Sequence, residues 1–440
     1  MQTTALFYCI MRWIEQRKIF RPNNVLRAQM TILDTSRKIL NSGPICDHCL
    51  GRQFAKLSTG LGNDQRGGAL KLVLAMQANA EKDHELEEEL KRCKESKCWI
   101  CNSLFEHLKA WAEKAILALS DYEYDNFLVG TKVTGLLAEN EEIIWAESGT
   151  TFAEPLKTEL NREVGKRVEK LTGKKANLKK PQVVALLDLE NDTIELEVNS
   201  LFIYGRYRKL IRGIPQTRWP CRECGGKGCE RCGYTGRMYQ ESVDELIRMH
   251  LLGAAQCEDT AFHGAGREDI DALMLGEGRP FIVEAKKPHK RSIDLAALES
   301  EINSRSEGKI EVNGLKFVES EAVEQLKAKK ADKEYRLKIE HNTTKEKLKS
   351  SLDILNGTLI RQKTPTRVLH RRADLERIRM VHSTELESFD LDTAFIKINC
   401  EGGLYVKELV SGDNGRTVPS IAELIGSEAK VIELEVIKVG

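Results

Sequence analysis

The residues best suited to chemistry lie in one octet, Gly-Ala-Gly-Arg-Glu-Asp-Ile-Asp, at positions 264–271. Arg267 and Asp269 are separated by one residue on a glycine-rich loop ahead of an expected strand, and such a loop can hold one carboxylate beside a ligand. The octet would also suit a glycine-rich turn with a surface ion pair. Asp271 offers a second carboxylate, so the octet alone identifies neither the working residue nor the reaction.

Eight of the twelve cysteines form four Cys-x-x-Cys pairs, a spacing typical of zinc sites. The first two pairs predict one four-sulfur site, and the last two predict a zinc-clipped hairpin. Reduced thiols and disulfides are the alternatives. Four cysteine ligands leave no open coordination position, so both sites would be structural. The expected zinc ligands are Cys46, Cys49, Cys98, Cys101, Cys221, Cys224, Cys229 and Cys232.

Composition bounds the class of protein. The chain has 440 residues, is 41% hydrophobic and carries a formal net charge of +1, which is typical of two or three globular domains. No apolar run is long enough for a membrane helix, and we expect a cytoplasmic protein. Residues 201–237 hold nine Lys or Arg against two Glu, and residues 358–381 hold seven against two acidic residues. Each basic stretch is either a solvated face or a surface for nucleic-acid phosphates.

Several elements must position these residues. We expect a helical extension over 1–40, then a zinc-pinned accessory region over 41–215 with an exposed charged helix at 79–94, a helix at 157–171 and strands at 183–187 and 193–198. A C-terminal domain over 216–440 would open with the cysteine hairpin at 221–236. Capping boxes predict helices that begin at Ser242 and Thr343, and alternating polarity predicts a strand from Tyr335. The fold class is therefore multidomain α+β, with a mainly antiparallel C-terminal sheet.

Two further segments accompany the octet in this last domain. They are the strand that opens at Tyr335 and the run Cys400-Glu-Gly-Gly-Leu-Tyr405-Val-Lys407. In kind and order, the three resemble the motifs of pseudouridine synthases: an Arg-x-Asp loop, a Tyr-led strand and a Gly-x-Tyr-x-Lys segment. The resemblance implies an isomerase with the pseudouridine synthase catalytic fold.

The resemblance also implies roles for single residues. Asp269 would be the catalytic carboxylate and nucleophile, kept ionised by Lys407, with Arg267 as a second candidate cation. Tyr335 and Tyr405 would contact the flipped uracil, although each also suits a core position. One departure stands out, because Glu268 occupies a position where the family often has Thr.

The resemblance narrows to the archaeal tRNA pseudouridine synthases that act at positions 54 and 55 of the TΨC arm. The cysteine pairs, the stretch Tyr204-Gly-Arg-Tyr-Arg-Lys-Leu and segments 362–374 and 412–419 all look like that family, over roughly residues 41–440. It implies a THUMP-like RNA-binding module within 41–215, tRNA as partner and no organic cofactor. The expected RNA-contacting residues are Arg206, Arg208, Lys209, Arg367, His370, Arg371 and Arg372.

Two alternative functions stay open. Asp271, Glu284 and Lys286 approximate the Asp…Glu-x-Lys pattern of metal-dependent nucleases, and the hairpin at 221–236 would suit a non-catalytic zinc RNA-binding or chaperone-like protein. The residues do not decide whether position 54, position 55 or both are modified, whether Asp269 attacks the sugar or the base, or which oligomer forms. Residues 1–29 are either a helical extension or precede a start at Met30.

Overall fold

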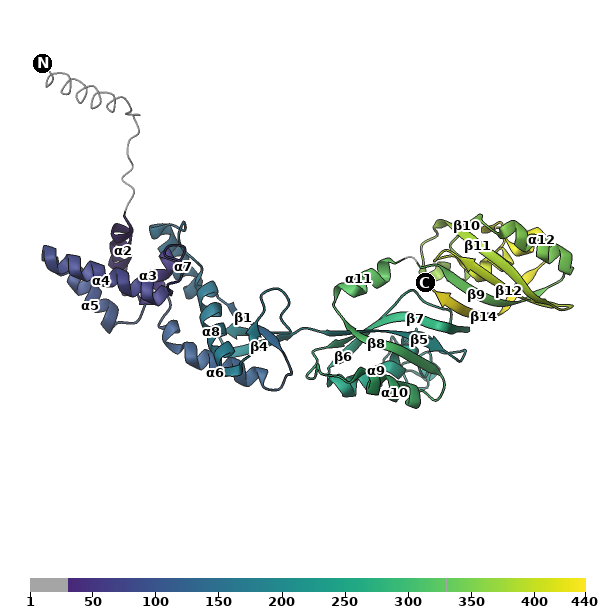
Figure 1. Ribbon diagram of the computed structural model, residues 1–440, viewed down its shortest axis with the longest axis horizontal. Helices are drawn as coiled ribbons and strands as arrows, with labels where there is room; N and C mark the ends of the chain where they lie inside the picture. The colour runs from purple at the N-terminus through teal and green to yellow at the C-terminus, as the bar shows by residue number, and fades with distance from the viewer. Residues whose placement is uncertain (1–30, 330) are drawn as a thin grey trace, which may run out of the picture. The chain divides into compact units, whose positions relative to one another are not determined.

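The computed structural model describes residues 31–329 and 331–440, and Figure 1 shows their helices and strands. The chain divides into two compact units. The first comprises the described residues up to Ala115, together with Val129–Gly173 and Leu186–Ile194; the second comprises Ile116–Leu128, Lys174–Ala185 and Glu195–Gly440. Most of the helical extension expected over residues 1–40 lies outside the described residues.

Helices dominate the accessory region. They are α2 (Ile32–Asn41), α3 (Asp47–Gly51), η1 (Arg52–Phe54), α4 (Asn63–Glu81), α5 (His84–Glu95), η2 (Leu104–His107), α6 (Leu108–Leu119), α7 (Leu136–Ser148) and α8 (Leu156–Thr172). A small sheet has the order β2-β1-β3-β4, with β1 at Asn126–Lys132, β2 at Lys175–Ala176, β3 at Val183–Asp188 and β4 at Thr193–Val198. Helix α8 buries Leu156, Leu160, Val164 and Val168. These apolar residues recur at the spacing of one helical face, which explains why the helix at 157–171 was predictable.

The charged segment at 79–94 differs from the single exposed helix that we expected. Helix α4 ends at Glu81, Lys82 adopts a left-handed φ of 57°, and the side chain of Asp83 caps α5 by accepting a hydrogen bond from the amide of Leu86. Leu86 and Leu90 are also buried. Because the segment is rich in Glu and Lys, its composition indicated neither the break between α4 and α5 nor the buried face of α5.

A ten-stranded sheet forms the C-terminal unit, in the order β13-β10-β11-β12-β9-β14-β7-β5-β8, with β6 also paired to β7. The pairing of β14 with β7 is parallel, and the other pairings described in this sheet are antiparallel. The predicted mainly antiparallel sheet is thus confirmed. The strands are β5 (Leu201–Lys209), β6 (Asp259–Gly264), β7 (Ala272–Lys286), β8 (Ile310–Val318), β9 (Lys333–His341), β10 (Thr358–Lys363), β11 (Glu376–Phe389), β12 (Thr393–Cys400), β13 (Thr417–Val418) and β14 (Ala429–Val439).

Helices cover this sheet, with α10 against β8 and α12 against β11 (Figure 1). Ser242 caps the first of them as predicted, whereas α12 is capped by Thr344, one residue later than expected, because its hydroxyl accepts from the amide of Lys347. The helices are α9 (Val243–Ala255), α10 (Leu295–Arg305), α11 (Glu321–Ala328), α12 (Lys345–Leu355), α13 (Val406–Ser411) and α14 (Ile421–Ile425), with short 3-10 turns η3 (Glu230–Cys232) and η4 (Thr366–Arg371).

The boundary between the two sheets falls earlier than residue 215, where we had expected it. Strand β5 pairs with both β7 and β8, so it lies inside the C-terminal sheet. Ile203 and Tyr207 on this strand belong to the buried core of that sheet. Residues 201–215 therefore belong with the C-terminal fold and not with the accessory region.

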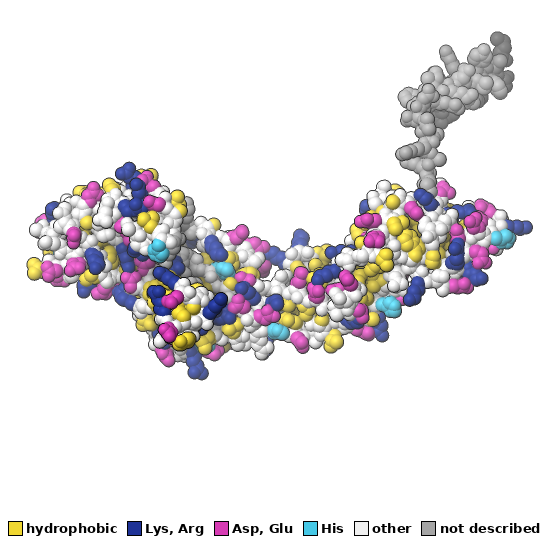
Figure 2. Space-filling view, turned by 180° about the vertical axis from the view of Figure 1, so that it is seen from behind, with side chains coloured by type: hydrophobic (Ala, Val, Ile, Leu, Met, Phe, Trp, Pro, Cys, Tyr) yellow, Lys and Arg dark blue, Asp and Glu magenta, His cyan; other side chains and the backbone are white. Residues whose placement is uncertain are grey.

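Charged side chains of both signs are mixed over the surface that Figure 2 displays, as the net charge of +1 suggests. Among the described residues, no helix is long and apolar enough to cross a membrane.

Candidate active site and metal centres

The three motifs meet in one pocket of the C-terminal unit. The octet forms the loop between β6 and β7, Tyr335 lies on β9, and Tyr405 and Lys407 lie at the start of α13. Together with Asp269 they line a pocket of ≈ 600 Å³. Segments that are distant in sequence are thus brought together around one carboxylate, as the motifs predicted.

Asp269 lies between two cations. Its Oδ2 is 3.4 Å from Nζ of Lys407 and 3.3 Å from a terminal nitrogen of Arg367. Nearby positive charges favour the ionised form of a carboxylate. Arg367 was expected to contact RNA from a loop; it also supplies a counter-charge that the sequence analysis did not assign to Asp269.

Asp271 shares Lys407 with Asp269 but is more open to solvent. Its Oδ2 is 2.7 Å from Nζ of Lys407, and its side chain is 66% exposed, against 33% for Asp269. Partial burial would raise the pKa of Asp271, but the hydrogen bond from Lys407 lowers it below the usual value. The more enclosed of the two carboxylates is Asp269.

Arg267 and Trp219 form one wall of the pocket. The guanidinium of Arg267 lies 4.6 Å from the ring centre of Trp219, an arrangement typical of cation–π contacts. Trp219 was not among the predicted site residues, although an indole beside a nucleotide pocket can stack on a base. Its position just before the cysteine hairpin gave no motif by which to find it.

The two predicted tyrosines occupy different settings. Tyr335 is 8% exposed and packs into the core on the same strand face as Leu337 and Ile339, yet it also lines the pocket. Burial raises the pKa of its phenol. Tyr405 is half-buried, and its hydroxyl accepts a hydrogen bond from Arg372 at 2.7 Å. Both of its backbone groups bond to the side-chain amide of Gln362, which fixes the start of α13.

Lys333 is a pocket residue that the sequence analysis missed. It lies two residues before Tyr335 on β9, on the same side of the strand, and lines the pocket. Burial and the nearby charge of Arg279 lower its pKa to about 8. The alternating pattern from Tyr335 could have been extended back by one step to find it.

The predicted RNA contacts divide into two groups. His370 and Arg372 are exposed near the pocket, on or beside η4; Arg371 belongs to the same turn, but its side chain lies outside the described part of the structure. Arg206 donates to the carbonyls of Glu277, Gly278 and Val439. Arg208 pairs with Glu311.

Lys209 requires a correction. It is fully buried, and its ammonium donates to the carbonyls of Ile214, Asp269 and Ile270. A side chain with no exposed surface cannot reach RNA, so the expectation of an RNA contact by Lys209 was wrong.

The structure also does not bring together the three residues of the nuclease pattern. Asp271 and Glu284 lie near opposite ends of β7, and Lys286 pairs with Asp259. Within residues 31–329 and 331–440, the clusters suited to a metal ion are the two sets of four cysteines.

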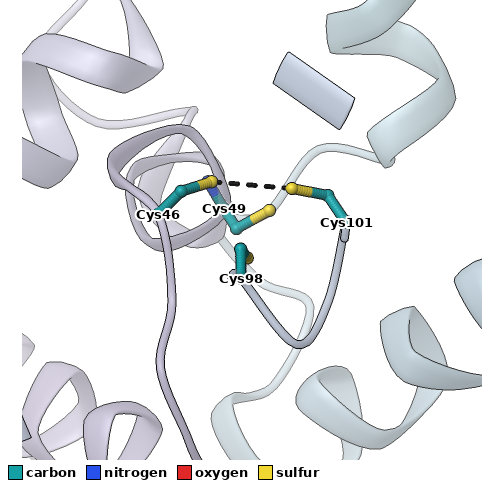
Figure 3. A group of neighbouring side chains, drawn as sticks. All are labelled: Cys46, Cys49, Cys98 and Cys101. Carbon is teal, nitrogen blue, oxygen red and sulfur yellow. Dashed lines mark hydrogen bonds between the residues drawn. The ribbon is translucent and has the colours of Figure 1, made fainter. Parts of the chain in front are cut away.

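The first cysteine set has the geometry of a tetrahedral site (Figure 3). The sulfurs of Cys46, Cys49, Cys98 and Cys101 lie within 4.8 Å of one another, with those of Cys46 and Cys101 at 3.7 Å. Zinc–sulfur bonds of about 2.3 Å give a tetrahedron with edges of about 3.8 Å, so the set fits zinc. The two pairs come from distant parts of the chain, which makes this site a clamp between α3 and the turn after α5.

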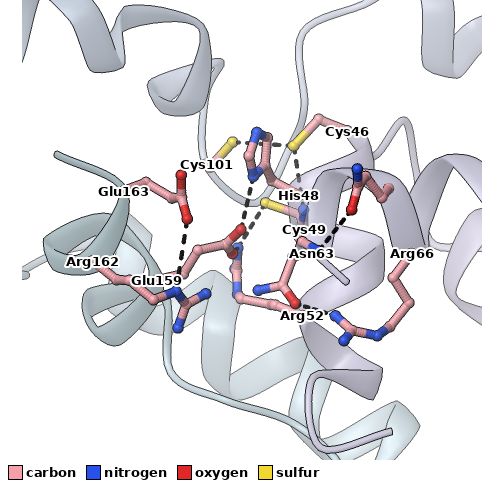
Figure 4. Close-up of polar contacts among 12 residues, drawn as sticks. Cys46, His48, Cys49, Arg52, Asn63, Arg66, Cys101, Glu159, Arg162 and Glu163 are labelled. Atoms are coloured by element: carbon pink, nitrogen blue, oxygen red, sulfur yellow. Dashed lines mark hydrogen bonds and ion pairs between the residues drawn. The ribbon is translucent and has the colours of Figure 1, made fainter. Parts of the chain in front are cut away.

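A buried arginine supports this set of sulfurs (Figure 4). Arg52 has no exposed surface, and it donates to Sγ of Cys49 at 3.0 Å. Its guanidinium also lies 3.6 Å from Glu141 and 3.9 Å from Glu159, on α7 and α8 respectively. His48 reaches Glu159 at 2.7 Å. The cysteine set is thus linked to two further helices through Arg52.

The second cysteine set forms the predicted hairpin. The sulfurs of Cys221 and Cys229 are 3.8 Å apart, and those of Cys229 and Cys232 are 3.7 Å apart. Backbone amides of Gly228 and Gly236 donate to sulfurs of the set at 3.1 and 3.2 Å, as they do around thiolate ligands. Cys221 is buried and the other three are half-buried. This set also fits a structural zinc ion.

Two family profiles match the chain. "Pus10, C-terminal" matches residues 202–440, and "Pus10 THUMP domain, archaeal" matches residues 111–188. The first match begins within β5, in agreement with the sheet boundary. The expected THUMP module is confirmed.

Curated relatives match over almost their whole length. The tRNA pseudouridine synthase Pus10 of Methanothrix thermoacetophila is 51% identical over 428 residues, covering 93% of this chain and 94% of the relative. Proteins with the same name from Halorubrum lacusprofundi and Methanopyrus kandleri are each 41% identical; these alignments cover 93% and 92% of this chain, and 96% and 98% of the relatives. The expected isomerase class is thereby confirmed, and the chain belongs to the Pus10 family of tRNA pseudouridine synthases.

Proposed function

We propose that this protein converts uridine 54, uridine 55 or both to pseudouridine in the TΨC arm of tRNA, with Asp269 as the nucleophile. One observation carries the assignment of Asp269: it is the pocket carboxylate held between Lys407 and Arg367, at 3.4 and 3.3 Å. Both cations lie beside the carboxylate that would attack, where they can stabilise its negative charge.

The reaction needs no redox cofactor. The bond between C1′ and N1 of the uridine breaks, the uracil turns, and a new bond joins C1′ to C5. The proton on C5 leaves, and N1 ends with a proton. Attack by Asp269 at the sugar or at the base would both begin from its ionised form, so the two cations serve either route.

The target uridine must leave its stack to enter a pocket of ≈ 600 Å³. We assign Tyr335 and Tyr405 to contact the uracil, because both line the pocket and each offers an aromatic ring and a hydroxyl. We assign Arg267, His370, Arg371 and Arg372 to the surrounding RNA. We also assign Arg206 and Arg208 to the RNA backbone, through terminal nitrogens that their bonds to Glu277, Gly278, Val439 and Glu311 do not use.

We further propose that each cysteine set binds one structural zinc ion. When bound, the metal cross-links chain segments and supplies no chemistry to the uridine, because four sulfur ligands fill its coordination shell. The first set would hold the accessory helices together, and the second would hold the hairpin at 221–236.

The test uses tRNA that carries tritium at uracil C5, incubated with the protein in the presence of EDTA. We expect label release with the strand intact, and pseudouridine mapping should find product at position 54, 55 or both. Asp269→Asn should abolish release while tRNA affinity stays within about threefold. Asp271→Asn is the matched control and should retain most of the rate. Activity that survives Asp269→Asn, or strand cleavage that needs Mg²⁺, would overturn the proposal.

A further inference from the structure

The loop that carries Asp269 rests on a layer of buried polar side chains. These residues, which we call the pedestal, come from β5, from the segment after it, from the loop itself and from β7. They are Tyr207 and Lys209 with no exposed surface, Gln216 and Glu268 at 6% exposed, and Arg279 at 1% exposed. We propose that the pedestal positions the carboxylate of Asp269 for the reaction, and that its members are positioning residues.

Lys209 holds the part of the loop nearest the carboxylate. Its ammonium donates to the backbone carbonyls of Asp269 at 3.2 Å and Ile270 at 3.0 Å, and to that of Ile214 at 3.0 Å. The three bonds use all three of its protons. An ammonium buried without such partners would be strongly unfavourable, so Lys209 and the two loop carbonyls constrain one another.

Glu268 anchors the loop one residue before Asp269. Its Oε2 lies 2.8 Å from Nε of Arg279, and both of its oxygens lie 2.8 Å from the hydroxyl of Tyr207, which donates to the carboxylate. Because Glu268 and Asp269 are adjacent, a fixed Glu268 side chain restricts the backbone from which the Asp269 side chain projects. The glutamate that departs from the usual Thr of the family thus has a specific partner beneath the loop.

The first half of the loop is held by the same layer. Arg279 donates to the carbonyl of Ala265 at 2.8 Å, and Gln216 donates to that of Gly266 at 3.0 Å. Gln216 also donates to the hydroxyl of Tyr207 at 2.9 Å, which joins the two halves of the network. Gly266 has a φ of +77°, a conformation that favours glycine, and a β-carbon added there would lie 3.3 Å from Nζ of Lys333 and 3.4 Å from a terminal nitrogen of Arg279.

The pedestal therefore contacts five loop residues between 265 and 270 through four hydrogen bonds to backbone carbonyls and one ion pair. Buried polar groups that bond to one another allow few alternative arrangements, since a shift would break several hydrogen bonds at once. Misplacement of a reacting group by about 1 Å can cost roughly 100-fold in rate, so a loop fixed in this way matters for catalysis. Two residues of the β5 stretch that resembled an RNA-binding segment, Tyr207 and Lys209, are thus buried and face this loop.

The inference rests on the proposed role of Asp269, and its test compares three variants of the full chain under single-turnover and steady-state conditions. Tyr207→Phe removes one hydroxyl, Glu268→Gln removes one charge, and Glu387→Gln is the control. Glu387 is an ion-paired carboxylate of the same sheet, held by Arg336 and by Lys397 at 2.9 Å, and it does not line the pocket.

We expect kcat to fall roughly 10-fold for Tyr207→Phe and roughly 100-fold for Glu268→Gln, while KM stays within about threefold. The control should keep both constants near those of the unchanged protein. Thermal unfolding gives the folded fraction at the assay temperature, so that loss of folded protein is separated from a slower chemical step. The decisive readout is a fall in kcat per folded molecule with little change in KM. A role in stability alone would leave kcat per folded molecule unchanged.

Values of kcat per folded molecule within about twofold of the control, for both Tyr207→Phe and Glu268→Gln, would overturn the inference. That outcome leaves the proposed function intact if Asp269→Asn is inactive in the same assay. Activity in Asp269→Asn would instead remove the proposed function on which the inference rests.

Discussion

Arg367 and Glu408 form an ion pair, with Nε of the arginine 2.7 Å from Oε1 of the glutamate, and the same guanidinium lies 3.3 Å from Asp269. The Glu408 side chain is 7% exposed, whereas that of Arg367 is 39% exposed. A planar guanidinium can face two carboxylates at once, and an ammonium cannot do so with the same geometry. Glu408 thus aims Arg367 at the candidate nucleophile.

The first prediction concerns this geometry. Arg367→Lys should lower kcat about 10-fold, because a lysine keeps the charge but cannot bridge Glu408 and Asp269. Steady-state kinetics with tRNA would measure the effect. Arg361→Lys, an exposed substitution on β10, is the matched control. Equal rates for the two variants would show that the bridging geometry is not needed.

The second prediction concerns the charge of Lys333. Its pKa is lowered to about 8, so it loses its proton as the pH rises through that value, whereas an ordinary lysine stays charged. We expect tRNA affinity to weaken severalfold from about pH 7 to about pH 9, because a lysine that lines the pocket proposed for the uridine loses its charge. Fluorescence titration at constant salt would measure this. In Lys333→Met the tRNA affinity should be lower at pH 7 and should stay constant over this range. If the affinity of this variant falls with pH as steeply as that of the unchanged protein, Lys333 is not the group that titrates.

The third prediction separates the two cysteine sets. The native protein should hold about two zinc ions per chain, and Cys98→Ala or Cys229→Ala should each reduce this to about one. Three cysteines of the first set are buried, against one in the second, so Cys98→Ala should cause the larger fall in melting temperature. Metal analysis and thermal unfolding test both statements. A native stoichiometry of one would mean that one set does not bind metal.

The fourth prediction concerns the buried arginine beside the first cysteine set. Arg52→Leu should destabilise the protein by about 3–5 kcal/mol, because it leaves Glu159 and Glu141 buried without their cation. Arg162→Leu is the control: this arginine of α8 is 39% exposed and pairs with Glu154, just before the helix, so its loss should cost about 1 kcal/mol or less. Chemical denaturation would measure the free energy of unfolding of both variants. Similar decreases for the two would show that the burial of Arg52 does not determine its contribution to stability.

Local patterns in the sequence predicted much of the fold and the centre of the site. Helix α8 has an apolar face at helical spacing, and β9 alternates between buried and more open positions. The contact of Lys407 with Asp269 was implied by the resemblance to pseudouridine synthases. The counter-charge from Arg367 was not, because nothing near residue 367 or 269 in sequence indicates that they meet.

Lys209 shows a case in which a usable signal was overlooked. Along β5, Ile203, Gly205, Tyr207 and Lys209 occupy alternate positions, and the structure buries all four. Counting charges over the stretch ignored this alternation and grouped Lys209 with half-buried arginines on the other face of the strand. The ammonium of Lys209 donates to three carbonyls outside its strand. No local pattern could predict these partners, because they meet Lys209 only in the folded structure.

The parallel pairing of β14 with β7 bears on how the protein acquires activity. It joins Leu434–Val436 to Ala272–Met274, directly after the Asp269 loop. The contact of Lys407 with Asp269 likewise joins residues that are far apart in the sequence. Contacts of such long range form slowly, because the chain loses the entropy of closing a large loop before the contact can stabilise it. During refolding, the recovery of catalytic activity should therefore lag behind the recovery of secondary structure.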